Sequence, residues 1–277
     1  MSEIVSIPSE GATLSGTLFR PDGDIAAALI IHPAVGAPQG FYRAFAEWAA
    51  SEGRLCLTYD YRDMGASATG PLRASKAGFV DWGLRDQAAA LAFLRAQAPD
   101  AALHVIGHSL GGFMTPFHAG SSEIGAMTTV ASGQAYLHDH PWPYRLSVYL
   151  FWFVLGPLMI RRRGYLLGSL LGGDDIPATA FYQWRRWCTR RAFYEPDIGG
   201  LLPQPVRPGL SGRLKIIAFA DDVMMPPKSV AKLAQRYPDA DITETVITPK
   251  DHDLRAIGHM KAFSRSNRKI WPEILPG

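Results

Sequence analysis

The stretch Leu103 to Gly112, LHVIGHSLGG, constrains the fold more than any other part of this chain. An apolar run typical of a strand ends at Gly107, and a helical pattern begins after Gly111. Between them lies Gly-x-Ser-x-Gly, the spacing of a nucleophile elbow centred on Ser109. Such a turn brings neighbouring chain close on both sides, so the flanking positions need residues without a Cβ atom. The pattern therefore predicts a serine hydroxyl at the carboxyl end of a sheet, where backbone N–H groups at the start of a helix face a developing anion.

Apolar runs and helical patterns alternate along much of the chain. Residues 3–20 read as a hairpin, and strands are expected at 26–32, 55–59, 103–107, 127–132, 214–219 and 242–247. Helices are expected at 41–51, 81–98, 110–118 and 227–237, with a last one running to about residue 275. This order is typical of the α/β class, in which a mostly parallel sheet has helices on both faces.

The alternation breaks at about Gln134 and resumes with the strand at 214–219. Residues 134–212 are therefore interpreted as an insertion between two parts of the core, 1–133 and 213–277. The insertion contains an apolar run, 148–160, that is too short and too interrupted by Gly156-Pro157 to span a bilayer, and Arg161 to Arg163 follow it. We favour a helical lid over the carboxyl edge of the sheet. The alternative is a helix lying on a membrane surface with a basic flank.

Composition limits the remaining classes. A chain of 277 residues that is 47% hydrophobic and 19% charged can bury a sizeable core, and its net charge of +3 is too small to imply nucleic-acid binding. Cys56 and Cys188 are far apart and suggest neither a disulfide framework nor a zinc site. No metal-ligand spacing, dinucleotide fingerprint or phosphate loop is present, so no cofactor and no metal are expected. The start lacks a secretory signal, and a cytoplasmic location is expected.

A serine in an elbow needs a base, and the base needs an orienting carboxylate. In sheets of this kind they follow in the order Ser, Asp, His on loops after later strands. Asp221 and Asp222 both follow the strand at 214–219. The proline four residues after Asp222 favours Asp222, and Asp221 is the alternative; the other aspartate would serve a turn or a helix cap.

The base should follow the last strand, where His252 and His259 are the candidates. Two aspartates flank His252 and would raise its pKa, which makes it a poor neutral base. His259 follows a glycine and has apolar neighbours, so we predict that His259 is the base. His108 lies next to the serine, but its side chain is expected to point away from the reaction.

An oxyanion in such a site needs two converging N–H donors. One is expected to be the backbone amide of Leu110, directly after the serine. The other should come from the loop after the strand at 26–32, at Ala34 or alternatively at Val35.

These motifs together resemble the α/β-hydrolase superfamily, and more narrowly the uncharacterised α/β-hydrolases grouped with the serine aminopeptidase-like hydrolases. The resemblance covers nearly the whole chain and rests on Gly107-His108-Ser109-Leu110-Gly111-Gly112, Asp60-Tyr61-Arg62-x-x-Gly65-x-Ser67, Asp221-Asp222, Ile257-Gly258-His259-Met260-x-x-Phe263 and Gln183-Trp184-x-x-Trp187-Cys188. It implies an eight-stranded, mostly parallel sheet with a helical lid, and a Ser-His-Asp hydrolase of unassigned substrate. The chain departs from relatives at Pro33 and at Asp63, where a glycine is usual.

We therefore predict a serine hydrolase that acts on small-molecule carboxylic esters or thioesters with apolar groups, through Ser109, His259, Asp222 and an acyl-enzyme. The aromatic and leucine-rich insertion motivates the apolar substrate. An acyltransferase with the same triad and a peptidase or amidase are alternatives. A lipid-binding or membrane-surface protein on the same fold is the non-enzymatic alternative.

Overall fold

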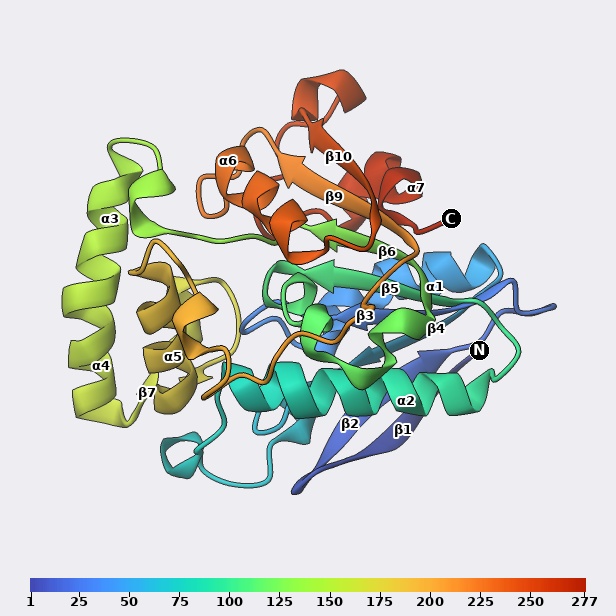
Figure 1. Ribbon diagram of the computed structural model, residues 1–277, viewed down its shortest axis with the longest axis horizontal. Coiled ribbons are helices and arrows are strands. Elements are labelled where there is room, and N and C mark those ends of the chain that lie inside the picture. The colour runs from blue at the N-terminus through green and yellow to red at the C-terminus, as the bar shows by residue number, and fades with distance from the viewer.

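The computed structural model describes residues 1–277 and is built on one eight-stranded sheet with helices on both faces (Figure 1). The strand order is β1-β2-β4-β3-β5-β6-β9-β10. β2 pairs antiparallel with β1 and with β4, and all other neighbours in this sheet are parallel. The strands of the sheet are β1 (Ser2–Ser9), β2 (Ala12–Phe19), β3 (Ala27–His32), β4 (Arg54–Tyr59), β5 (Leu103–His108), β6 (Ile124–Val130), β9 (Arg213–Phe219) and β10 (Asp241–Ile247). The expected fold class is confirmed.

Helices cover both faces because the central strands are apolar on both sides. In β3, Ala28 and Ile30 belong to the core on one face, and Leu29 and Ile31 belong to the core on the other. α1 and α7 pack on the second face, and α2 and α6 on the first. This two-sided burial is why the strands read as continuous apolar runs rather than as alternating ones. The helices are α1 (Arg43–Ser51), α2 (Gln87–Gln97), α3 (Tyr144–Leu150), α4 (Gly156–Arg163), α5 (Ala178–Cys188), α6 (Pro227–Val230) and α7 (Trp271–Ile274).

The prediction of a helix at residues 110–118 is wrong. The chain after Ser109 instead forms two short 3-10 turns, Ser109–Gly112 and Thr115–Phe117. Two adjacent glycines and Pro116 explain the difference, since glycine disfavours the helix and proline lacks the N–H that a second helical turn needs. The helix expected at 227–237 is α6 followed by a 3-10 turn, and the last helix is reduced to a 3-10 turn and the short α7.

Residues 134–212 lie outside the main sheet, because β6 ends at Val130 and β9 begins at Arg213. They hold α3, α4, α5 and a small antiparallel pair, β7 (Tyr165–Leu166) and β8 (Ile176–Pro177). A π-helical turn, Phe151–Leu155, joins α3 to α4, so one continuous helix runs from Tyr144 to Arg163. In Figure 1 these helices stand beyond the carboxyl ends of the parallel strands. No helix combines the length and the hydrophobicity that crossing a bilayer requires.

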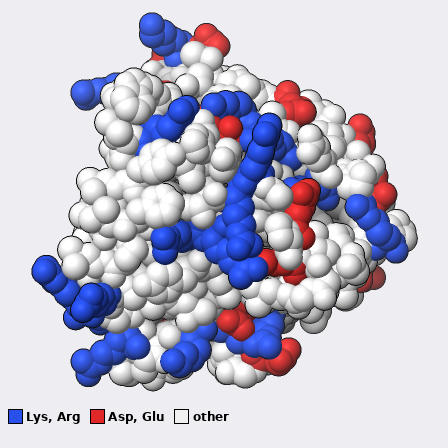
Figure 2. Space-filling view, turned by 60° about the vertical axis from the view of Figure 1, so that its left-hand side comes forward, with Lys and Arg blue, Asp and Glu red and all other residues white.

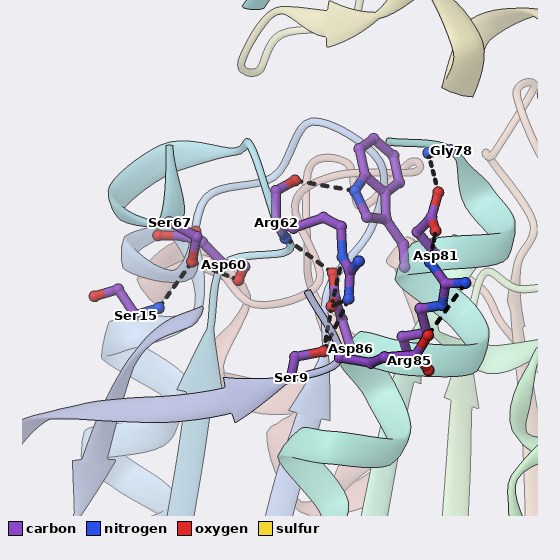
Figure 3. A network of polar contacts seen from close by, with 11 residues as sticks. Ser9, Ser15, Asp60, Arg62, Ser67, Gly78, Asp81, Arg85 and Asp86 are labelled. Atoms are coloured by element: carbon purple, nitrogen blue, oxygen red, sulfur yellow. Dashed lines mark hydrogen bonds and ion pairs between the residues drawn. The ribbon is translucent and has the colours of Figure 1, made fainter. Parts of the chain in front are cut away.

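The loop after β4 is held by polar contacts to three other elements (Figure 3). The Arg62 guanidinium donates to the buried Asp86 carboxylate at 2.7 Å, and the Ser9 hydroxyl donates to the same oxygen at 2.8 Å. The Ser67 hydroxyl donates to the Asp60 carbonyl and accepts from the backbone N–H of Ser15, each at 2.8 Å. Burial raises the pKa of Asp86, and the hydrogen bonds from Arg62 oppose that rise. The Asp-Tyr-Arg motif thus fixes the loop to β1, to β2 and to Asp86, the residue before α2.

Backbone conformation explains two residues of this loop. A Cβ atom on Gly65, which has φ +45°, would lie 2.6 Å from the Asp60 carboxylate, so a larger residue does not fit. Asp63 has φ +61°, a conformation that glycine adopts freely and that aspartate tolerates better than most residues. Its carboxylate accepts from the Ser75 hydroxyl at 2.6 Å. This left-handed conformation is one that a glycine would adopt without strain.

Three histidines, His32, His108 and His118, are completely or almost completely buried. Burial lowers the pKa of each, to about 3 for His108 and about 4 for His118, and to well below 6.5 for His32. In the unfolded chain the same groups titrate near 6.5. The unfolded chain therefore binds more protons than the folded protein between about pH 6.5 and about pH 4, and stability falls as the pH falls through that window.

We predict that His118→Gln reduces this acid destabilisation by about 1.4 kcal/mol per pH unit, because one fewer proton is taken up on unfolding. His138→Gln, which removes an exposed histidine, is the matched control. Urea unfolding near pH 7.5 and near pH 5 measures the slope. Equal slopes for wild type and His118→Gln would contradict the prediction.

Candidate active site

Ser109 lies in a strained turn directly after β5. Its φ is +51°, which side-chain-bearing residues rarely adopt. A Cβ atom on Gly107 would lie 2.5 Å from the Gly112 backbone, and one on Gly111 would lie 2.1 Å from the carbonyl oxygen of His32. The close approach expected on both sides of the serine is therefore present, and it explains why both flanking positions are glycine.

The structure brings Ser109, His259 and Asp222 together from three loops. His259 Nε2 is 3.0 Å from Ser109 Oγ, and its Nδ1 is 2.8 Å from Asp222 Oδ2. The Ser109 hydroxyl donates to Nε2, and Nδ1–H donates to the carboxylate, when the imidazole is neutral. The His259 side chain is 9% exposed and that of Asp222 is fully buried. These are the distances and the order of contacts that proton transfer from a serine to a histidine requires.

The local structure keeps Asp222 ionised. Burial alone would raise its pKa, but hydrogen bonds from His259 and from two backbone amides outweigh burial and lower it. The amides of Met224 and Met225 donate to Oδ1 at 2.8 and 2.9 Å. The turn after β9 thus holds Oδ1, and Oδ2 is free to accept the hydrogen bond from His259.

Asp221 and His252, the alternative candidates for the acid and the base, lie elsewhere. Asp221 is exposed and accepts the backbone N–H groups of Ile257 and Gly258 at 2.9 and 3.0 Å. It therefore holds the loop that presents His259 and makes no contact with the imidazole. His252 Nε2 lies 3.3 Å from a Glu273 carboxylate oxygen, and His252 is not among the residues that line the cavity at Ser109.

A chain of hydrogen bonds connects the loop after β3 with the loop that carries His259. The Ala34 N–H donates to the Tyr42 hydroxyl, which lies 2.8 Å from His108 Nδ1; His108 Nε2 lies 2.9 Å from the His259 carbonyl. The backbone groups fix the protons, since an N–H only donates and a carbonyl only accepts. The Tyr42 O–H therefore donates to Nδ1, and Nε2–H donates to the carbonyl. The neutral imidazole that this requires agrees with the lowered pKa of His108.

This chain corrects the prediction for Ala34. Its amide already serves the Tyr42 hydroxyl at 2.8 Å in a buried pair, so it is not free to bind an oxyanion. Val35, the alternative, lines the cavity that contains Ser109, together with Leu110, whereas Ala34 does not. The His108 ring lies between the Tyr42 hydroxyl and the His259 carbonyl, and His108 is not among the residues that line the cavity at Ser109. No sequence signal indicated Tyr42 or the loop-holding contacts of Asp221.

Two neighbouring cavities lie at this site. The smaller, of about 40 Å³, contains Ser109 and His259 and is otherwise mostly apolar. The larger, of about 280 Å³, lies in the insertion and is lined mainly by apolar side chains of α3, the π-helical turn and α5. Both cavities share four lining residues, Ala135, Trp184, Cys188 and Met224. An apolar space thus adjoins the serine on the side of the insertion.

The comparisons with known proteins agree with this fold. The sequence profile described as "Alpha/beta hydrolase family" matches residues 28–265. The chain therefore belongs to the α/β-hydrolase family. Comparison with curated proteins finds no match.

Solved structures with a similar fold cover almost the whole chain. A putative hydrolase from Agrobacterium vitis S4 is 15% identical with a TM-score of 0.63, covering 99% of this chain and 97% of that chain. A soluble variant of monoglyceride lipase from Saccharomyces cerevisiae, in complex with a substrate analogue, is 15% identical with a TM-score of 0.66, covering 98% and 94%. An esterase from Pyrococcus furiosus is 16% identical with a TM-score of 0.58, covering 99% and 88%. At these identities the likeness is one of fold.

We predict that Tyr42→Phe destabilises the protein by about 1–3 kcal/mol, because it leaves the buried Ala34 N–H and His108 Nδ1 without a partner. Tyr182→Phe is the matched control, since Tyr182 is exposed and the same hydroxyl is removed. Urea unfolding of both variants provides the measurement. A Tyr42→Phe protein as stable as the control would show that the chain of hydrogen bonds does not form.

Proposed function

We propose that the protein is a serine hydrolase that cleaves carboxylic esters or thioesters with an apolar group through a covalent acyl-enzyme. The observation that carries the proposal is the line of contacts from Ser109 through His259 to Asp222. Solved structures of similar fold include esterases and a monoglyceride lipase, which supports esters as the substrate class.

Each of the three side chains has one role. Ser109 Oγ attacks the substrate carbonyl while His259 Nε2 takes its proton, and Asp222 holds the imidazole by Nδ1 and stabilises its charged form. The tetrahedral intermediate collapses as His259 returns the proton to the leaving alcohol or thiol. Water then attacks the acyl-enzyme with the same histidine as base, which releases the acid and restores the serine.

The oxyanion is assigned to the backbone amides of Leu110 and Val35. Both residues line the cavity at Ser109, and the amide of Ala34 is occupied. The strained turn presents the Leu110 amide next to the attacking oxygen. Removing one such donor costs about 3–4 kcal/mol of transition-state stabilisation in serine hydrolases.

The insertion, residues 134–212, is proposed to act as a lid that carries the apolar part of the site. Trp184 and Cys188 of α5 line both cavities, so the insertion contributes walls to the space around the serine. An acyl or alkyl chain in the larger cavity would exchange water for apolar side chains, at about 0.8 kcal/mol per methylene. This favours substrates with an extended apolar group over acetate.

We predict that Ser109→Ala abolishes both ester hydrolysis and labelling by a fluorophosphonate probe, because the attacking oxygen is lost. Asp222→Ala should lower kcat by about 10⁴-fold. Asp221→Ala serves as the matched control and should lose far less, since it perturbs only the loop. Steady-state kinetics with a soluble ester measures these effects. A folded wild-type protein that the probe does not label would refute a covalent mechanism.

We predict that kcat/KM for p-nitrophenyl esters rises by up to about fourfold per methylene until the larger cavity is filled. Ala135→Leu, in the wall that both cavities share, should remove this rise, and the slope with chain length rather than the rate with acetate is the readout. Ala74→Leu, at an exposed position outside both cavities, is the control. A wild-type preference for acetate would sink the proposed apolar subsite without affecting the covalent mechanism.

A further inference from the structure

The helix from Tyr144 to Arg163 is apolar on two opposite sides. Every fourth residue is buried against the rest of the protein: Val148, Trp152, Gly156 and Ile160. On the outer side the exposed residues are also apolar: Leu146, Tyr149, Leu150, Phe153, Val154 and Leu158. A surface helix ordinarily has polar residues there, and a contiguous exposed apolar patch marks an interaction site. We call these six side chains the outer face.

The surroundings of the outer face are basic. The helix ends in Arg161, Arg162 and Arg163, all exposed, and the Arg185 guanidinium of α5 lies 5.0 Å from the centre of the Phe153 ring. No acidic residue occurs between His140 and Gly173. Residues 134–212 carry nine arginines against five acidic residues, a net charge of +4 in a chain whose total is +3. Figure 2 shows this side of the molecule as a broad uncharged area bordered mainly by Lys and Arg.

We propose that the outer face binds the surface of an anionic lipid bilayer, with the helix lying parallel to the membrane plane. At about 1.5 Å per residue the helix is about 30 Å long, and its apolar side chains would enter the boundary between headgroups and acyl chains. The arginines at its end and on α5 would lie at the level of the lipid phosphates, where cations are attracted.

Charge favours a bilayer over a second copy of the chain. In a two-fold contact the outer face would meet itself. The arginines of one copy would then face the same acid-free segment of the other, with no carboxylate to pair with. An anionic lipid surface supplies phosphate oxygens as partners for the arginines, whereas this segment supplies no carboxylate.

The inner side of the same helix faces the apolar cavity. Val148, Phe151, Trp152 and Leu155 line that cavity, whereas Leu150 and Val154 point outward and do not. A helix is about 10–12 Å wide, so a docked bilayer would lie one helix away from the cavity next to Ser109. Binding to the bilayer and hydrolysis can therefore be tested separately.

Flotation with vesicles of phosphatidylglycerol, compared with vesicles of phosphatidylcholine, tests the proposal. The wild-type protein should float with the anionic vesicles, and binding should weaken in high salt. Leu150→Gln/Val154→Gln, at side chains that are 47% and 50% exposed, should weaken binding at least tenfold. Ile4→Gln/Val246→Gln removes two apolar side chains elsewhere that are 85% and 55% exposed, more than the outer-face pair, and should bind as the wild type does.

The cations are tested in the same way. Arg161→Gln/Arg162→Gln/Arg163→Gln should weaken binding to anionic vesicles about a hundredfold. Lys250→Gln/Arg255→Gln/Arg265→Gln, which removes three exposed cations far along the chain, is the matched control and should have little effect. Ser109→Ala should bind as the wild type does, which makes the result independent of the proposed chemistry. Thermal unfolding and hydrolysis of a short soluble ester establish that each binding variant is folded.

Three results would overturn the proposal. The first is a wild-type protein that stays with the unbound fraction at low salt. The second is equal loss of binding in the outer-face variant and its control. The third is a dimer, seen by light scattering, that Leu150→Gln/Val154→Gln converts to a monomer, since the outer face would then belong to a contact between copies.

Discussion

The close packing of the backbone around Ser109 is the constraint on which the rest of the site depends. The serine holds a left-handed conformation only because β5 is clamped between β3 and β6 and because Gly107 and Gly111 leave room for the Gly112 backbone and the His32 carbonyl. Strain of this kind persists when surrounding structure over-determines it. The parallel sheet, buried on both faces, supplies that rigidity, and the hydroxyl is thereby set at its carboxyl edge.

Four loops at that edge are then held to one another by buried or partly buried hydrogen bonds. Tyr42 and His108 connect the loop after β3 and the elbow to the backbone of His259. Asp221 holds the backbone just before His259, and Asp222, its neighbour, holds the imidazole. The two adjacent aspartates therefore divide the tasks of positioning the loop and positioning the ring. His108 helps to position the same loop as a neutral ring, because burial lowers its pKa.

The insertion gives the molecule two different apolar surfaces on one helix. Its inner stripe packs on α5 and borders the cavity near the serine, and its outer face is exposed beside arginines. A covering lid and a membrane-surface helix are the two interpretations that the sequence of residues 148–163 allows. One helix can have both properties, since its buried and exposed apolar residues lie on opposite sides. The proposed lid and the proposed lipid contact are therefore compatible.

Local pattern alone determined the α/β class and predicted the elbow, because sheet order and turn geometry leave short-range marks in the sequence. It also predicted His259 and Asp222, which lie in line with Ser109. It failed at residues 110–118, where a helical pattern was outweighed by Pro116 and two glycines. It also failed at Ala34, since the amide is occupied by a hydroxyl from a separate segment. Only the tertiary structure decided that contact, the clamp made by Asp221 and the exposure of the outer face. Each depends on which residues from distant parts of the chain meet, and no local periodicity encodes that.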